Sequence, residues 1–308
     1  MPEKIKSFEE MEALALAGQK QTVALAAADS QEALLAVDHA RRKGIIKAIL
    51  VGDAAKVKEI CASSNIDLSA YELEDVPEPR KAAARAVAVV KEGRAGMLMK
   101  GLVETGDFLR AIMDKEKGLR GGRRMCSVVL MECQARKKLL VLADVGTNIA
   151  PGVDEKADII ASCTDVARAI GIETPKAAVL CAQEKVQPET MPITVEASIL
   201  AKMGERGQIP GGAIVEGPIS MDIAVDEHAS QVKKFGGKIQ GDADILIAPD
   251  LEAGNILIKG LMYLTDNVRV AGVGMGARVP LILTSRGDDN ATKYYSIVLA
   301  SLISRRAG

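Results

Sequence analysis

The chain has 308 residues, enough for two domains and a large core, and its 48% hydrophobic and 26% charged residues are ordinary for a soluble globular protein. A net charge of -1, with basic residues spread along the chain, argues against a nucleic-acid surface. Aromatic residues make up only 2% of the sequence and Trp is absent, which argues against base-stacking platforms.

The first third of the chain alternates between apolar strands and amphipathic helices. Asp29, with Glu32 three residues later, is typical of a capping box at a helix start. The alternating polarity of 71–76 predicts an exposed edge strand. Strands are expected at 21–28, 48–51, 71–76 and 97–100, and helices at 8–19, 29–44, 53–63, 77–92 and 106–115. This order predicts a parallel sheet with helices on both faces, which binds ligands at the carboxyl ends of its strands.

The rest of the chain continues the pattern after the charged, glycine-rich segment 115–124, which predicts a crossing between domains. Strands at 126–131 and 138–143 are expected to pair in antiparallel fashion. Further strands are expected at 177–181, 213–215, 245–248, 268–273 and 279–283, and helices at 154–170, at 193–203, after 218 to about 229, and at 252–264. The last helix should begin within 288–292 and run to about 304.

The segment 279–295 places Ser285 and Arg286 where a buried strand turns into this last helix. A helix start offers unpaired backbone N–H groups and the positive end of the helix dipole. Arg286 adds a planar fork of donors that suits phosphate, and Gly287 would let the backbone approach a ligand closely. The corner is a candidate anion site, although such residues at a helix start are also common as caps and surface side chains.

Other predicted strands also end in polar or glycine-containing loops, at Lys100-Gly101, Glu216-Gly217-Pro218 and Pro249-Asp250. If these strands are parallel, the loops face one cleft. The segment from Asp250 to Asn255 is either a helix cap with a packing glycine at Gly254 or a cradle of backbone amides for a polar ligand.

Three further kinds of site are weakly supported. Asp222 and Asp226, four residues apart on a presumed helix, could hold a divalent cation, but such a pair more often lies on a solvated face, and we expect no metal. The sequence lacks a P-loop and a G-x-G-x-x-G motif, and neither histidine supports a catalytic triad.

The five cysteines lack C-x-x-C spacing, and most lie in apolar strands or on helices, so we expect core residues in a reducing cytoplasm. The N-terminus has no signal core, and no uncharged apolar run approaches the ~20 residues of a membrane span. We therefore expect a cytoplasmic protein with no membrane partner.

Three segments in combination resemble the phosphate acetyl/butyryltransferase family. They are V-E-G-P-I-S-M-D at 215–222, G-D-A-D-I-L-I-A-P-D-L-E-A-G-N-I-L-I-K-G-L at 241–261 and G-A-R-V-P-L-I-L-T-S-R-G at 276–287. The resemblance covers the whole chain in length and order. The E-A-G-N form and the ending T-S-R-G-D-D-N-A-T-K-Y-Y-S-I resemble the butyryl-transferring members more than the acetyl-transferring ones.

The resemblance implies two α/β domains of the isocitrate/isopropylmalate dehydrogenase-like fold, with mostly parallel sheets flanked by helices and an active-site cleft between the domains. Domain one would be 1–124 plus 275–308, and domain two 125–274. The implied reaction converts butyryl-CoA, or a similar short-chain acyl-CoA, and phosphate to acyl phosphate and CoA. The resemblance also implies a homo-oligomer that needs no metal or redox cofactor.

Individual residues carry over from the family. Ser285 and Arg286 match its active-site serine and arginine, and Arg110, in T-G-D-F-L-R, matches a family arginine. Together with these, we expect substrate to contact Gly217, Asp250, Gly254, Asn255 and Gly287. The acetyl-transferring members place an aspartate, their proposed base, where this chain has Thr292, so the base is undetermined. Direct transfer in a ternary complex fits these residues, because bound phosphate needs positioning more than deprotonation.

Three alternatives stay open at this point. The chain could act on acetyl-CoA as a phosphate acetyltransferase. It could be a metal- and NAD-dependent dehydrogenase of the same fold, with Asp222 and Asp226 as the metal pair. It could also be a non-catalytic acyl-CoA sensor, although its retained Ser285-Arg286 pair favours catalysis.

Overall fold

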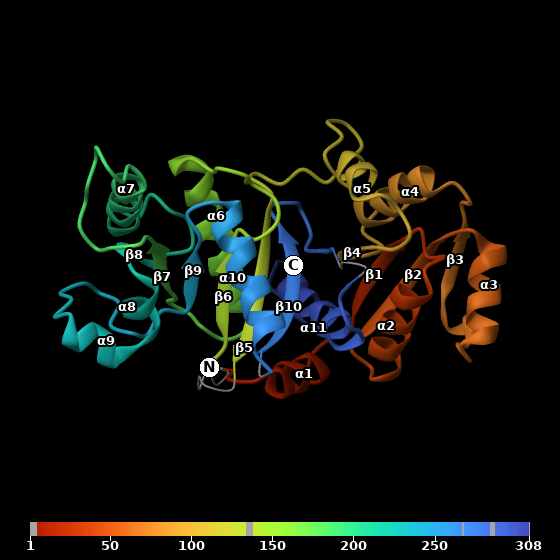
Figure 1. Ribbon diagram of the computed structural model, residues 1–308. Coiled ribbons are helices and arrows are strands. Elements are labelled where there is room, and N and C mark those ends of the chain that lie inside the picture. The colour runs from red at the N-terminus through yellow and green to blue at the C-terminus, as the bar shows by residue number, and fades with distance from the viewer. Residues whose placement is uncertain (1–4, 134–137, 267, 284–286, 308) are drawn as a thin grey trace. The chain divides into compact units, whose positions relative to one another are not determined.

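The computed structural model describes residues 5–133, 138–266, 268–283 and 287–307, and it divides into two compact units. Unit 1 comprises Met1–Ser7 and Arg123–Val270, and unit 2 comprises Phe8–Gly122 and Ala271–Gly308. Each unit is a sheet flanked by helices (Figure 1), and most strand pairs in each sheet are parallel. The predicted α/β class with mostly parallel sheets is therefore confirmed.

Unit 2 is built from both ends of the chain. Its elements are α1 (Phe8–Ala17), β1 (Gln21–Ala26), α2 (Gln31–Arg42), β2 (Ile46–Gly52), α3 (Ala54–Ser63), the 3-10 helix η1 (Leu68–Ala70), β3 (Glu72–Asp75), α4 (Pro79–Lys91), β4 (Met97–Lys100), α5 (Thr105–Ile112), β11 (Leu281–Ile282) and α11 (Asn290–Ala307). The strands lie in the order β3-β2-β1-β4-β11, all parallel. The predicted edge strand is confirmed as β3.

The strand order of unit 2 changes direction between β1 and β4. The chain runs outward from β1 through β2 to β3 and then returns to place β4 on the other side of β1. Because parallel crossovers are right-handed, this reversal puts α4 on the face of the sheet opposite α2. A reversal of this kind leaves a crevice at the carboxyl ends of the two central strands, which is where such folds bind ligands.

The strands of unit 1 lie in the order β5-β6-β9-β7-β8, in which β5 and β6 pair in antiparallel fashion and the other pairs are parallel. The antiparallel pair was predicted. Its elements are β5 (Cys126–Cys133), β6 (Leu140–Ala143), α6 (Val153–Ala169), β7 (Lys176–Leu180), α7 (Ile193–Glu205), β8 (Ile214–Ile219), α8 (Met221–Val225), α9 (Glu227–Val232), β9 (Ile245–Ile247) and α10 (Leu251–Leu264), and β10 (Val268–Met275) begins in this unit.

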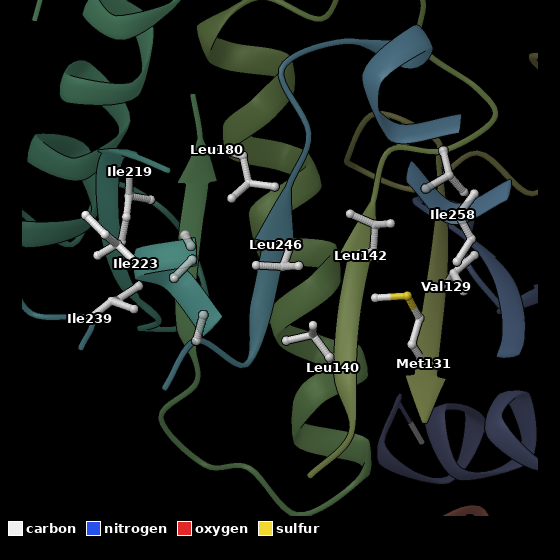
Figure 2. Close-up of a cluster of buried hydrophobic side chains, with 14 of the residues drawn as sticks. Val129, Met131, Leu140, Leu142, Leu180, Ile219, Ile223, Ile239, Leu246 and Ile258 are labelled. Carbon is white, nitrogen blue, oxygen red and sulfur yellow. The ribbon is translucent and has the colours of Figure 1, made fainter. Parts of the chain in front are cut away.

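A cluster of buried apolar side chains covers one face of the unit 1 sheet (Figure 2). Leu140 and Leu142 on β6 both belong to it, as the two-residue period of a strand requires. Ile258 of α10 joins the same cluster, so α10 packs its inner side on this face. Aliphatic residues and Met form the cluster, in agreement with the low aromatic content.

Three predicted boundaries are wrong. The strand expected at 213–215 continues to Ile219, because Leu180 of β7 pairs with Ile219, so Gly217 lies inside β8 rather than in a loop. The helix expected through Ala229 is broken at Asp226 into α8 and α9. Ser30, not Asp29, caps α2. Among the described helices, none has the length and apolar character needed to cross a bilayer.

Candidate active site

A pocket of about 320 Å³ opens in unit 2 at the carboxyl ends of β1 and β4. The turn from β1 to α2, the loop after β4 and one residue of α11 line it: Asp29, Ser30, Gln31, Glu32, Ala33, Lys100, Gly101, Leu102, Val103 and Lys293. It therefore occupies the crevice that the reversal of strand order creates. Of these residues, the sequence pointed to a site only at Lys100-Gly101.

At the pocket residues Gly101 and Leu102, the backbone of the loop after β4 lies close to that of β1. The N–H groups of Gly101 and Leu102 donate to the carbonyl oxygens of Ala26 and Ala27, each at 2.8 Å, so the loop after β4 still follows β1. A Cβ atom at position 101 would collide with the Ala27 carbonyl oxygen. Glycine is therefore needed at 101 for close packing, which is one of the uses of glycine in a strand-to-helix loop.

The start of α2 forms one wall. The Ser30 hydroxyl accepts a hydrogen bond from the Ala33 N–H at 3.4 Å and caps the helix. The N–H groups of Gln31 and Glu32, at the first two helical positions, have no acceptor within the helix. With the positive end of the helix dipole, they make this wall favourable for an anion.

Two lysines line the same pocket. The Lys293 side chain is 5% exposed, and its Nζ atom lies 2.8 Å from Glu32 Oε2 and donates to the Asp288 carbonyl oxygen at 2.7 Å. The hydrogen bond from Lys293 holds the pKa of Glu32 below its ordinary value. Lys100 Nζ donates to the carbonyl oxygens of Gly101 and Val103 at 3.3 and 3.1 Å. The two ammonium groups add positive charge beside the α2 start, and two carboxylates in the same lining, Asp29 and Glu32, offset it.

The start of α11 lies where the sequence predicted it, at Asn290. The Asp289 side chain accepts from the Thr292 N–H at 2.7 Å and serves as the cap. Gly287, expected to contact substrate, is exposed and precedes this cap. Ser285 and Arg286, the expected catalytic residues, lie outside the described residues.

Arg110 also belongs to unit 2 but does not line the pocket. Its side chain is 73% exposed and forms an ion pair with Asp107 within α5. Asp107 also accepts from Arg80 Nε at 2.7 Å. An exposed guanidinium of this kind is free to swing toward an anionic ligand, because a surface ion pair holds it only weakly.

Three residues of unit 1 that were expected to contact substrate lie at the start of α10, and each has a structural role there. Asp250 caps the helix by accepting from the Ala253 N–H at 2.8 Å. A Cβ at Gly254 would collide with the Asp144 carbonyl oxygen, and Asn255 Nδ2 donates to the Val145 carbonyl at 3.0 Å. These contacts are those of a cap and a packing glycine. Gly217 packs in the same manner, because a Cβ there would lie 2.8 Å from Val179 Cβ.

The loop after β6 is organised by a buried carboxylate that the sequence did not reveal. Asp144, 3% exposed, accepts hydrogen bonds from four backbone N–H groups, those of Ser127, Gly146, Thr147 and Asn148, at 3.0–3.1 Å. The Asn148 side chain donates to it as well, at 2.5 Å. Because Asp144 and Val145 also meet Gly254 and Asn255, this carboxylate fixes the loop against α10.

The aspartates proposed as a metal pair have separate roles. Asp226 caps α9 by accepting from the Ala229 N–H at 2.7 Å. Asp222 accepts from Ser220 Oγ at 2.7 Å and pairs with Lys233 at 2.9 Å, and these contacts lower its pKa to about 2. Within the part of the chain that the structure describes, no three His, Cys, Asp or Glu side chains are grouped as a metal site would need.

Comparison with known proteins identifies the family of this chain. The profile of the phosphate acetyl/butaryl transferase family matches residues 76–301. A phosphate butyryltransferase from Clostridium acetobutylicum is 42% identical over 97% of this chain and 99% of its own length. A phosphate acetyltransferase from Rhizobium meliloti is 41% identical, over 87% of this chain and 84% of its own length.

Solved structures extend the similarity. A branched-chain phosphotransacylase from Enterococcus faecalis is 30% identical over 92% of this chain and 99% of its own, with a TM-score of 0.80. A 4-hydroxythreonine-4-phosphate dehydrogenase from Klebsiella pneumoniae, 13% identical, covers 93% of this chain and 100% of its own with a TM-score of 0.58, and shows the dehydrogenase-like fold alone. The chain is an α/β transferase. It belongs to the phosphate acetyl/butyryl transferase family.

Proposed function

We propose that this protein transfers a butyryl group, or a similar short acyl group, reversibly between CoA and inorganic phosphate. The observation that carries the proposal is the 42% identity to a phosphate butyryltransferase over nearly the full length of both chains. A second phosphate butyryltransferase, from Clostridium beijerinckii, is 40% identical over 98% of this chain and 99% of its own. The substrates are then acyl-CoA, phosphate and acyl phosphate, with CoA itself as a substrate or product.

The pocket of unit 2 supports the anionic part of this chemistry. A phosphate needs N–H donors and positive charge, and the α2 start, Lys100 and Lys293 supply both at one place. Ser285 and Arg286 are proposed as the catalytic residues, and they precede the cap of α11, the helix that contributes Lys293 to the pocket. Arg110 and Gly287 are proposed as further substrate contacts.

The proposed reaction is direct transfer in a ternary complex. A phosphate oxygen attacks the thioester carbonyl carbon, a C–O bond forms, the C–S bond breaks, and the sulfur leaves as CoA thiolate. Arg286 would hold the phosphate against the carbonyl, and Ser285 would donate a hydrogen bond to the developing oxyanion or to the leaving sulfur. Since Thr292 occupies the position of the family aspartate, Arg286 is proposed to stabilise the thiolate by its charge.

The residues of unit 1 that were expected to contact substrate already have structural partners within the unit. Asp250, Gly254 and Asn255 hold α10 to the loop after β6, and Gly217 packs inside β8. We propose that they contribute to binding through the backbone they position. The domains proposed from the sequence, 1–124 plus 275–308 and 125–274, and a cytoplasmic location belong to the same proposal.

Acetyl-CoA is the alternative acyl donor, because phosphate acetyltransferases from Rhizobium meliloti and Thermotoga maritima are 41% and 39% identical to this chain. A butyryl group has two more methylenes than an acetyl group, and burying each methylene in a well-shaped apolar pocket contributes about 0.8 kcal/mol to binding. The shape of the acyl pocket therefore decides between the two donors. The contacts of Asp222 and Asp226 do not favour the dehydrogenase alternative, which needs them as a metal pair. Asp222 pairs with Lys233, whereas Asp226 accepts a hydrogen bond from the Ala229 N–H.

The test measures free CoA thiol released from butyryl-CoA and from acetyl-CoA, each with and without phosphate. We expect phosphate-dependent release that is faster with butyryl-CoA. Faster release from acetyl-CoA would keep the family and change the acyl group. Tight binding of acyl-CoA without phosphate-dependent release of CoA would favour the non-catalytic sensor. Recovery of an acylated enzyme made from acyl-CoA without phosphate would overturn direct transfer.

A further inference from the structure

The lining of the unit 2 pocket has an apolar part beside its charged one. Ala33, Leu102 and Val103 are the apolar residues of the lining. Ala33 and Val103 are 4% and 6% exposed, so their surface is already in contact with the rest of the unit, whereas Leu102 is 50% exposed. Of these three residues, Leu102 therefore has the most surface left for a ligand to contact.

The backbone on both sides of Leu102 is fixed by hydrogen bonds. The Leu102 N–H donates to the Ala27 carbonyl oxygen at 2.8 Å, and the Val103 N–H donates to the Gly101 carbonyl oxygen at 3.0 Å. Lys100 Nζ also donates to the carbonyl oxygens of Gly101 and Val103. A residue on a backbone held in this way has a defined position, which is what discrimination between similar ligands requires.

The position of Leu102 in the pocket gives its exposure a meaning. A leucine that is exposed alone on a protein surface needs no explanation. Leu102, however, follows Lys100 and Gly101 in a lining that also contains the start of α2. A charged wall and an apolar wall in one pocket suit a ligand with an anionic head and a short apolar tail.

The chemistry of the proposed reaction places such a tail near the phosphate. In an acyl phosphate, one oxygen atom joins the phosphorus to the carbonyl carbon, so the first carbons of the acyl chain lie close to the phosphate group. If the α2 start and the lysines bind the phosphate, the acyl chain lies against residues that border the same pocket. Leu102 is the exposed apolar residue at that place.

From these observations we propose that Leu102 is a specificity-determining residue whose side chain contacts the acyl chain of the substrate beyond its carbonyl carbon. This inference rests on the proposed function and refines it by naming one wall of the acyl site. An acetyl group has a single methyl carbon beyond the carbonyl, and a butyryl group has two methylenes more. The contact with Leu102 therefore favours butyryl over acetyl, because burying apolar surface stabilises the complex with the longer chain.

The first experiment measures kcat/KM with butyryl-CoA and with acetyl-CoA for wild type and two variants at position 102. Leu102→Asn keeps a similar size but removes the apolar surface, and it should lower the butyryl-to-acetyl ratio by about four- to fifteenfold, or about fourfold for each methylene. Leu102→Met keeps an apolar side chain of similar volume, so its ratio should stay within about twofold of wild type. The KM for phosphate should stay near that of wild type in both variants.

A matched control separates the acyl contact from a general effect of replacing an exposed leucine. Leu16 is 45% exposed on α1 and does not line the pocket, so Leu16→Asn should leave the butyryl-to-acetyl ratio unchanged. An active wild type with the same ratio in Leu102→Asn would overturn this inference and keep the proposed function. A wild type without phosphate-dependent release of CoA from either thioester would overturn the proposed function, and this inference with it.

The second experiment locates the acyl chain without turnover, by the rate at which a methanethiosulfonate reagent modifies Leu102→Cys. Cys133→Ser removes the least buried native thiol, and burial raises the pKa of the other four, that of Cys126 to about 12 and that of Cys181 to about 11, so that they react slowly. The ligands are butyrylphosphonate and acetylphosphonate at saturation, whose C–P bond prevents acyl transfer. Butyrylphosphonate should slow the modification more than acetylphosphonate does, and equal rates with the two would show that the acyl chain lies elsewhere.

Discussion

The ammonium group of Lys293 lies 2.8 Å from the Glu32 carboxylate, although 261 positions separate the two residues in sequence. The pair joins the last helix of unit 2 to its second helix, at the pocket between β1 and β4. Only the lysine is buried: its side chain is 5% exposed, and that of Glu32 is 59% exposed. Removing either partner should therefore have different consequences.

Lys293→Met keeps the length of the side chain and removes two hydrogen bonds, to Glu32 and to the Asp288 carbonyl oxygen. We expect a loss of about 1–3 kcal/mol in the free energy of unfolding, the range for hydrogen bonds made by a charged group. Glu32→Gln should destabilise the protein less, because Glu32 is 59% exposed and the new amide oxygen can still accept a hydrogen bond from Lys293. Urea denaturation of both variants checks the order, and a Glu32→Gln variant less stable than Lys293→Met would contradict it.

Lys100→Met should weaken phosphate binding. The pocket then keeps the α2 start but loses one of its two ammonium groups, so we expect the KM for phosphate to rise about tenfold, or roughly 1.4 kcal/mol, with a smaller change in kcat. Lys91→Met is the control, because Lys91 is exposed on α4 and does not line the pocket. Steady-state kinetics at varied phosphate concentration measure both, and an unchanged KM in Lys100→Met would remove the pocket from phosphate binding.

Gly254→Ala should be among the most damaging single-methyl additions in the chain. The new Cβ would meet the Asp144 carbonyl oxygen, a backbone atom that cannot turn away, and overpacking of this kind costs about 1–3 kcal/mol. Gly106→Ala is the matched control, since a Cβ at that helical position meets nothing within 4 Å and should stabilise α5 slightly. Thermal unfolding compares the two, and equal melting temperatures would refute the packing role of Gly254.

Asp144→Asn should loosen the loop after β6. An amide has a donor where the carboxylate has an acceptor, so several of the four backbone N–H groups would lose their partner in a buried site, at a cost of about 2–4 kcal/mol. Asp154→Asn, at an exposed position on α6, should stay within about 0.5 kcal/mol of wild type. Amide hydrogen exchange should also rise at 146–148, and unchanged exchange there would argue against the role of Asp144.

The pH dependence of stability contains a contribution from Asp222. Hydrogen bonds from Ser220 and Lys233 lower its pKa from 3.8 to about 2, so its ionised form stabilises the fold above the unfolded pKa. This contribution is lost as the pH falls through about 2. NMR titration should find a higher pKa for Asp222 in Lys233→Met, and Asp222→Asn should flatten the acid limb of the stability curve slightly, because the side chain is exposed.

The course of the sheets followed from local patterns, and the errors have specific causes. Gly217 and Pro218 are turn formers by type, yet pairing of Ile219 with Leu180 keeps them in β8. Asp29 and Ser30 are both good caps, and Asp29 is instead buried, 3.8 Å from Lys56. Contacts between residues distant in sequence, such as Lys293 with Glu32 or Asp144 with Gly254, produce no local sequence pattern. The sequence therefore could not predict the pocket wall or the loop after β6, and both were found only in the structure.

The assembly of unit 2 from both ends of the chain sets an order of events during synthesis. Leu98 and Met99 of β4 pair with Leu281 and Ile282, which leave the ribosome among the last residues. Strands β5 to β9 of unit 1 have all been made by Ile247. We therefore expect unit 1 to fold on the ribosome and unit 2 to wait for the end of translation. Nascent chains stalled after α10 and a C-terminal linker long enough to span the ribosomal exit tunnel would show this as protease resistance confined to unit 1.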